Sequence, residues 1–125
     1  MEHKNAEHTI RCKAPDVMLT WNEATDNLEA WMNNKDAEPN MTKIICTSLR
    51  AWRNRDNLPF PMTEVPQIVI EAMIEQDGIG WYNFTNGFIS KKWRLIQRAY
   101  FKDLRSMKSP ELWIARFQRR IWEIA

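Results

Sequence analysis

The sequence GIGWYNFTNGFISKKW, which spans residues 78–93, holds all three glycines of the 125-residue chain beside two tryptophans, a tyrosine and two phenylalanines. Glycine readily adopts the left-handed backbone conformation that a β-carbon disfavours, so Gly78 and Gly87 are each predicted to end a helical segment. Between them the pattern predicts a short helical segment over about residues 79–86. Gly80, which lies among large side chains, is expected to let another helix approach the backbone closely. The aromatic rings would then fill the space that the two bends create.

A longer helix is predicted directly after this stretch, with Ser90 as its N-cap, because a serine hydroxyl accepts a hydrogen bond from an early backbone N–H. Apolar and amide side chains recur at helical spacing along one of its faces, at Trp93, Ile96, Gln97 and Tyr100, with Leu104 as a further candidate. The predicted structural core motif of the chain therefore consists of Gly78, Ile79, Gly80, Trp81, Phe84, Gly87, Ser90, Trp93, Gln97 and Tyr100.

The part of the chain before this stretch also has helical patterns. The residues from Thr20 to Glu23 fit a capping box, although a helix start one turn earlier, at Asp16, agrees with the sequence as well. An apolar stripe follows, formed by Trp21, Thr25, Leu28, Trp31 and Met32. A second helix is predicted from the N-cap Asn40 to about Arg55, with an inward face formed by Met41, Ile44, Ile45, Leu49 and Trp52.

Two more helices complete the prediction. Pro66 is tolerated only in a first helical turn, so a third helix is expected to start at Thr63 or Glu64. Its inward face would be Ile68, Val69, Ala72, Met73 and Gln76. Ser109, Pro110 and Glu111 supply a capping hydroxyl, a first-turn proline and a first-turn acid for the last helix. That helix continues through Trp113, Phe117, Ile121 and Ile124, and then stops without a cap or breaker, which indicates a helix that is cut short.

These patterns predict an all-α fold, a compact bundle of four to five helices in a single domain over residues 16–125. A flexible, disordered polar tail is expected over residues 1–15. No apolar run approaches the roughly 20 residues of a membrane span, and the polar N-terminus does not resemble a signal peptide. We therefore expect an intracellular protein, cytoplasmic or nuclear, with no membrane partner and with Cys12 and Cys46 reduced.

Motifs for catalysis or for cofactors are not evident in the sequence. The glycine-rich stretch lacks the preceding strand and the third glycine spacing of a nucleotide-binding loop. Candidate zinc ligands do not have paired-ligand spacing, and three of the four lie in the predicted tail: His3, His8, Cys12 and Cys46. The carboxylates of one predicted helix are explained by its outer face: Glu71, Glu75 and Asp77. We therefore expect no enzyme activity, no metal, no cofactor and no small-molecule substrate.

The C-terminal third is strongly basic. Residues 1–90 contain 8 Lys or Arg against 13 Asp or Glu, a balance of −5, whereas residues 91–125 contain 10 against 3, a balance of +7. The candidate nucleic-acid-binding residues are Lys91, Lys92, Arg94, Arg98, Lys102 and Arg105 on one helix and Arg116, Arg119 and Arg120 on the next. A continuous positive ridge on the first helix would suit a phosphate backbone. The alternative is that this charge only balances the acidic half of the chain.

The tryptophan-rich pattern also resembles a family of uncharacterised open reading frames found near or fused to reverse-transcriptase sequences of mobile elements in single-celled eukaryotes. The shared motif, Q-x-x-IGWxxFxxGxxSxxWxxxQxxY, is matched over Ile79–Tyr100, with Gln76 as the leading glutamine. Further matches are Leu28, Trp31, Leu49, Arg50, Trp52 and Arg53, so that the resemblance covers about residues 20–124. The chain lacks the Trp-x-x-Arg-Asn-like segment that follows in the family. The resemblance implies an accessory role in element biology.

Two hypotheses follow for function. The first is a non-catalytic helical module that binds DNA or RNA electrostatically through its basic helix. The second is a protein–protein or oligomerisation module that uses exposed apolar surface, or the uncapped last helix, and binds no nucleic acid.

Overall fold

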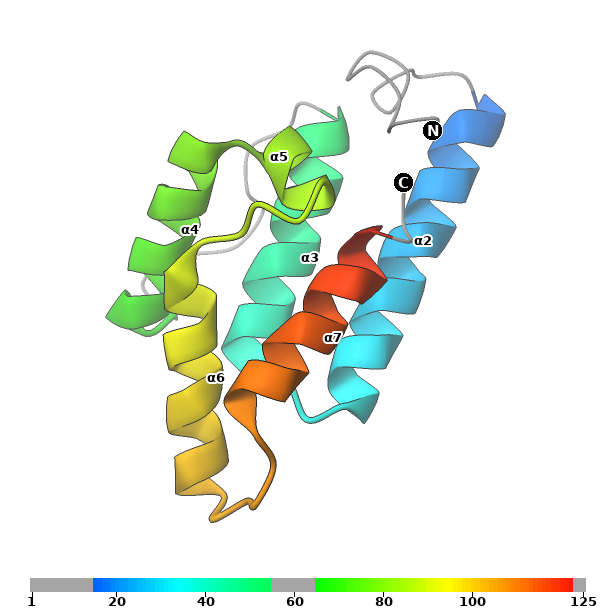
Figure 1. The fold of residues 1–125 in the computed structure, drawn as a ribbon. Helices are drawn as coiled ribbons and strands as arrows, with labels where there is room; N and C mark the ends of the chain where they lie inside the picture. Colours follow the sequence, from blue (N-terminus) through cyan, green and yellow to red (C-terminus); the bar gives the residue numbers. More distant parts are fainter. Residues whose placement is uncertain (1–14, 55–64, 123–125) are drawn as a thin grey trace.

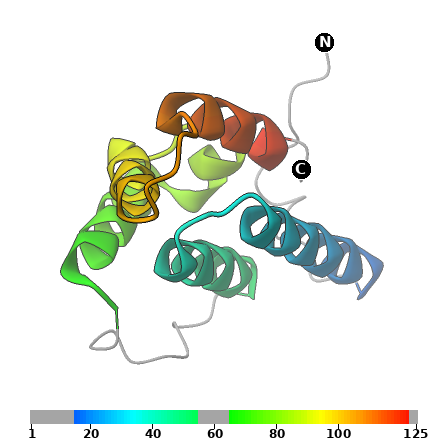
Figure 2. The same ribbon diagram turned by 90° about the horizontal axis from the view of Figure 1, so that it is seen from below.

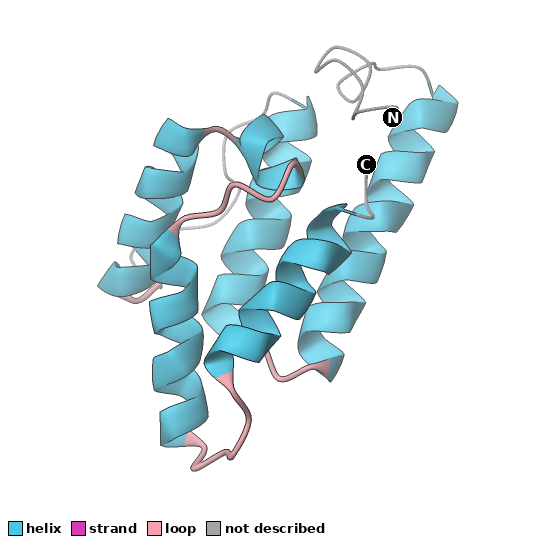
Figure 3. Ribbon diagram, in the orientation of Figure 1, coloured by secondary structure: helices cyan, strands magenta, loops and turns pink. Residues whose placement is uncertain are grey.

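The computed structural model describes residues 15–54 and 65–122, with side chains described for residues 21–52 and 65–122. Every regular element within these ranges is an α-helix, which confirms the predicted all-α fold. The helices are α2 (Pro15–Asn34), α3 (Pro39–Asn54), α4 (Gln67–Ile79), α5 (Trp81–Thr85), α6 (Lys91–Asp103) and α7 (Pro110–Trp122) (Figure 1). Figure 3 shows how short loops connect α4, α5, α6 and α7 in succession. Most of the predicted tail, and the predicted starts at Thr63 and Glu64, lie outside the described residues.

The helices pack around one core. Helices α2 and α3 form an antiparallel hairpin, α4 lies along α6, and α7 packs against both α6 and α2 (Figures 1 and 2). The short helix α5, which lies between α4 and α6 in the chain, packs against both α4 and α7. The largest side chains that are fully buried come from α2, α3, α5, α6 and α7: Trp93, Phe84, Phe101, Phe117, Leu28, Met32, Met41, Ile44, Ile45, Leu49 and Ile121. Because these helices share the cluster, the basic C-terminal helices are fixed directly on the N-terminal hairpin.

The start of α2 lies at Pro15. The predicted start at the Thr20 capping box is therefore wrong, because residue 20 is already inside the helix, and the alternative start near Asp16 is the one that agrees. Proline suits a first turn because the N–H that it lacks has no partner inside the helix there. The predicted stripe is confirmed in part, since Trp21, Thr25, Leu28 and Met32 are buried whereas Trp31 is only half-buried.

The predicted N-cap of α3, Asn40, is wrong. The helix begins at Pro39, and the carboxylate of Glu38 accepts a hydrogen bond from the Met41 N–H at 2.7 Å. Asn40 instead donates its side-chain amide to the other Glu38 oxygen at 3.2 Å. The sequence did not distinguish Glu38 from Asn40, two polar residues on either side of Pro39 that can both serve as a cap. The inward face of α3 is confirmed, with Trp52 half-buried at its end.

The roles predicted for Gly78 and Gly80 at the end of α4 are wrong. The helix continues through Gly78 to Ile79, and Gly80 ends it with a φ of +104°. A β-carbon on Gly80 would meet only the side chain of Asn83, at 3.3 Å, so the close approach of another helix is not the reason for glycine there. The predicted inward face holds at Val69, Ala72, Met73 and Gln76 but not at Ile68, which is 47% exposed. Gly87, with a φ of +91°, follows α5 as predicted.

The two glycines are predicted to respond oppositely to substitution by alanine. Gly80→Ala should lower the free energy of unfolding by about 1–3 kcal/mol, because an L-residue is strained at this positive φ. Gly78→Ala should raise it by about 0.5 kcal/mol, since residue 78 is helical and no atom lies within 4 Å of the added β-carbon. Urea denaturation followed by circular dichroism measures both. Equal effects would mean that Gly80 does not end the helix as described.

Gln76 connects α4 with the segment that leads into α6. Its side chain is fully buried, and its Oε1 accepts hydrogen bonds from the Ser90 N–H at 2.8 Å and the Trp93 Nε1–H at 3.0 Å. Its Nε2 donates to the Phe88 carbonyl at 3.1 Å and lies 3.5 Å from the Gly80 carbonyl. One amide therefore satisfies buried polar groups on both sides of α5, and it fixes the geometry of the glycine-rich stretch.

Gln97 has a similar role in the middle of α6. It is fully buried, its Oε1 accepts from the Glu38 N–H at 3.0 Å, and its Nε2 donates to the Asp36 carbonyl at 2.8 Å. The loop between α2 and α3 is therefore held by a side chain of α6. On the same helix, Phe101 is buried and Leu104 is 52% exposed. The predicted inward position at Tyr100 is thus wrong by one residue.

Candidate nucleic-acid interface

The cations of α6 occupy the part of the helix that faces away from the core. Ser90 caps the helix as predicted, since its hydroxyl accepts a hydrogen bond from the Lys92 N–H. Lys91, Arg98 and Lys102 are exposed on the same face, and Arg94 is half-buried beside them. The predicted basic face therefore exists over about three turns of α6.

Two of the candidate cations, Lys92 and Arg105, do not lie on this face. Helix α6 ends at Asp103, and Arg105 lies beyond it in a left-handed turn with a φ of +54°. The expectation that Arg105 continues the helical ridge is therefore wrong. Lys92 points toward α4, where its Nζ lies 3.7 Å from a carboxylate oxygen of Glu75. The exposed cations that remain on this face of α6 are Lys91, Arg98 and Lys102.

Arg98 forms an ion pair with the first turn of α7. Its guanidinium lies 3.0 Å from a carboxylate oxygen of Glu111, and both side chains are more than half exposed. The hydrogen bond from Arg98 lowers the pKa of Glu111. An exposed pair of this kind is readily screened by salt and adds little stability. An anionic ligand can therefore compete for Arg98.

The arginines of α7 do not extend the face of α6. Arg116, Arg119 and Arg120 line a hollow on the α2 side of α7. The opposite side of α7 faces α6 and the segment before it, where Glu111 contacts Arg98 and Gln118 donates to the Gly87 carbonyl at 3.1 Å. The nine candidate residues are thus divided between two surfaces on either side of α7.

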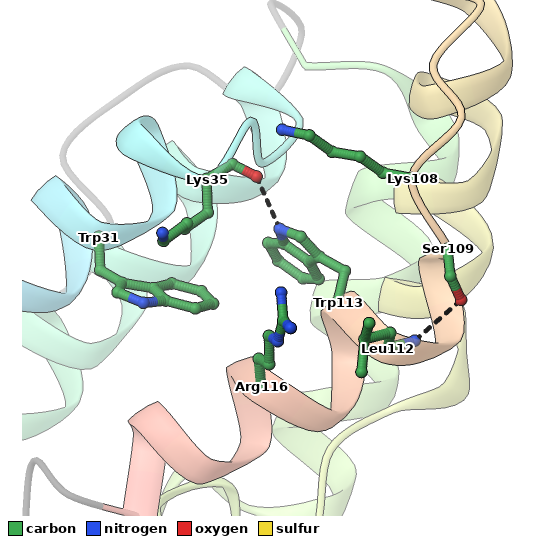
Figure 4. A pocket seen from close by; sticks show the side chains of 7 residues that line it. All are labelled: Trp31, Lys35, Lys108, Ser109, Leu112, Trp113 and Arg116. Atoms are coloured by element: carbon green, nitrogen blue, oxygen red, sulfur yellow. Dashed lines mark hydrogen bonds between the residues drawn. The ribbon is translucent and has the colours of Figure 1, made fainter.

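The second surface is a trough between α2 and α7, made of two adjoining hollows of about 280 and 270 Å³. Trp31, Lys35 and Arg116 line both hollows. One hollow is completed by Lys108, Ser109, Leu112 and Trp113, and the other by Arg119 and Arg120. In Figure 4 the guanidinium of Arg116 points toward the space between the indoles of Trp31 and Trp113, and the Lys35 side chain lies above Trp31. We call this surface the α2–α7 trough.

The aromatic walls of the trough are held in place by the core. The Nε1–H of Trp113 donates to the Lys35 carbonyl at 2.8 Å (Figure 4). The ring of Trp31 stacks on Phe117, with 6.2 Å between ring centroids and 16° between planes, and its centroid lies 5.8 Å from that of Trp113. Because these contacts restrict the rings before any ligand arrives, binding there costs little conformational entropy.

Trp31, Lys35 and Lys108 were not among the predicted site residues. Trp31 was assigned to the core stripe because its spacing fits that stripe. Trp31 and Lys35 are four residues apart near the end of a helix, so they lie on one face. This spacing is the sequence signal from which a shared site could have been predicted. Lys108 forms an ion pair with Asp36 across the end of the trough. No local pattern indicated that contact, which joins two loops far apart in the sequence.

Cys46 is buried, and two carboxylates of α4, Glu75 and Asp77, are hydrogen-bonded to other side chains. Burial raises the pKa of the Cys46 thiol to about 12, so it is not a nucleophile near neutral pH. The carboxylate of Glu75 accepts a hydrogen bond from the Ser90 hydroxyl, and that of Asp77 accepts from the Trp81 Nε1–H at 2.5 Å. Among the described residues, no group of three or more His, Cys, Asp or Glu side chains could hold a metal ion. The histidines lie outside the described part.

Comparison with known proteins adds no assignment. No family model, curated protein or solved structure matches the chain. None of the helices in the described ranges is long and apolar enough to cross a membrane.

Proposed function

We propose that the chain is a non-catalytic helical module that binds nucleic acid through phosphate contacts from exposed cations of α6 and α7. Such a module could act as an accessory protein of a mobile element, as the sequence resemblance implies. The supporting observation is the distribution of ion pairs. Within residues 21–52 and 65–122, Lys92 and Lys108 of the basic third pair with acids of the first 90 residues.

Acids of the first half whose side chains are described also pair within that half. Its Asp26 and Glu29 pair with Arg50 of the same half, at 2.6 and 2.9 Å. In the described part of the chain, no ion pair is formed by Lys91, Arg94, Lys102, Arg105, Arg116 or Arg119. Side chains of this kind can displace the counterions of a polyanion, and that release drives nucleic-acid binding.

The proposal predicts that neutralising α6 weakens binding. Lys91→Gln/Lys102→Gln should reduce affinity for a labelled 20-nucleotide strand about fivefold to tenfold at 100 mM salt. The slope of log K against log salt should fall by about 1.4, because each lost contact to a single strand removes about 0.7. Fluorescence anisotropy between 50 and 300 mM salt measures both quantities.

The matched control is Lys43→Gln, which removes a charge from an exposed lysine of α3 in the acidic half. It should change affinity less than twofold. The proposal fails if the unmodified chain does not bind at 50 mM salt, or if the control weakens binding as much as the α6 variant does.

A second candidate function, docking to another protein chain, is favoured by the surface between α4 and α6. A hollow there is lined mostly by apolar side chains, and two of them, Ile68 and Leu95, are 47% and 44% exposed. Light scattering after size exclusion tests self-association through this surface. A mass that stays monomeric at high protein concentration would remove that form of the candidate.

A further inference from the structure

We propose that the α2–α7 trough binds an unpaired stretch of nucleic acid, with a base stacked on Trp31 and its flanking phosphates on Lys35, Arg116 and Arg119. This inference rests on the proposed function and deepens it, because it assigns the ligand class and a second site away from α6. The ligand chemistry is that of a single strand, either DNA or RNA.

The charge of the trough selects an anion. The side chains that line its two hollows include the cations Lys35, Lys108, Arg116, Arg119 and Arg120, and no Asp or Glu of the described residues lines either one. Lys108 is paired with Asp36. Among the described residues, Lys35, Arg116 and Arg119 form no ion pair. The hollow between α4 and α6 differs, because Glu38 and Asp103 line it.

The aromatic ring of Trp31 favours a ligand with a nucleic-acid base. Trp31 is half-buried, stacks on Phe117 from the core side, and borders both hollows. Stacking of a base on an aromatic side chain contributes strongly to single-strand binding, and it accepts any base because every base has a π-face. A duplex keeps its bases stacked inside, so it cannot offer one to Trp31 without opening.

The geometry supports a strand rather than a single small molecule. The two hollows adjoin along α7 and share Trp31, Lys35 and Arg116, so the surface continues past the aromatic pair toward Arg119. An open, elongated trough with cations on both sides of a ring is the arrangement of a single-strand groove.

The test uses the full chain with labelled oligo-dT, oligo-U and a duplex of equal length, measured by anisotropy over a salt series. Trp31→Leu should weaken single-strand binding about tenfold without changing the salt slope, because a stacking contact releases no phosphate counterions. Trp31→Phe should recover part of the loss. Arg116→Gln/Arg119→Gln should weaken single-strand binding and lower its slope by about 1.4, while duplex binding changes less than threefold.

Lys91→Gln/Lys102→Gln is the matched control, because it makes the same charge change on α6 and should weaken both ligands equally. The trough assignment is overturned, and the proposed function kept, if only the α6 variant weakens binding. It is also overturned if the trough variants weaken duplex and single strand alike. If the unmodified chain binds none of the three ligands, both proposals fail. If circular dichroism shows that Trp31→Leu does not fold, the Arg116→Gln/Arg119→Gln variant and Trp31→Phe decide the outcome.

Discussion

Replacing Gln76 with leucine is expected to lower the free energy of unfolding by about 3–5 kcal/mol. The variant leaves the buried Ser90 N–H and Trp93 Nε1–H, and the partly buried Phe88 carbonyl, without their partner. Each buried polar group that loses its hydrogen bond costs about 1–3 kcal/mol, and local adjustment recovers part of the sum. Leucine fills a similar volume, so the loss would be of hydrogen bonds rather than of packing.

The matched control is Gln67→Leu at the first position of the same helix, where the side chain is exposed. It should change stability by less than about 0.5 kcal/mol. Urea denaturation followed at 222 nm measures both variants, and an unchanged m-value would show that the unfolded state is the same. If Gln76→Leu costs less than about 1 kcal/mol, the buried amide does not hold the glycine-rich stretch.

The second large effect is expected for Phe117→Ala, at about 3–5 kcal/mol, the usual cost when a buried phenylalanine is truncated. Phe117 is fully buried, and its ring lies 5.0 Å from Trp113, 6.2 Å from Trp31 and 6.1 Å from Phe84, measured between centroids. It therefore joins α7 to both α2 and α5. The variant removes the support behind Trp31 together with core volume.

Two measurements separate this packing role from a general loss of helix stability. Leu112→Ala on the same helix, at a position 51% exposed, should cost much less than Phe117→Ala in urea denaturation. Near-ultraviolet circular dichroism should lose intensity in Phe117→Ala, because the tryptophans on either side lose their fixed environment. A Phe117→Ala variant with full stability would contradict the described core.

The sequence predicted the features that depend on adjacent residues. Ser90 and Ser109 were identified as caps, and both hydroxyls accept the expected backbone hydrogen bonds at 3.1 Å. A cap is a local interaction, so a few residues determine it. Local patterns could not decide between near neighbours, because Gly78 and Gly80 are both glycines that can end a helix. Only the φ angle in the folded chain separates them.

Features that depend on the packing of distant segments were not predictable in this way. The trough combines Trp31 and Lys35 of the first hairpin with Arg116 of the last helix, and helical spacing does not tell which face of α7 meets α2. The basic third looked continuous in sequence because one helix follows the other. In the fold, the turn between α6 and α7 places the two groups of cations on different sides of α7.

The clamp formed by Gln97 has a consequence for how the protein is made. Its two partners in the α2–α3 loop lie 59 and 61 residues earlier in the chain. During synthesis the first hairpin therefore leaves the ribosome long before the side chain that completes its loop. Until α6 is made, the loop lacks these two hydrogen bonds, so fragments that end before residue 97 are expected to hold the hairpin less firmly than the whole chain does.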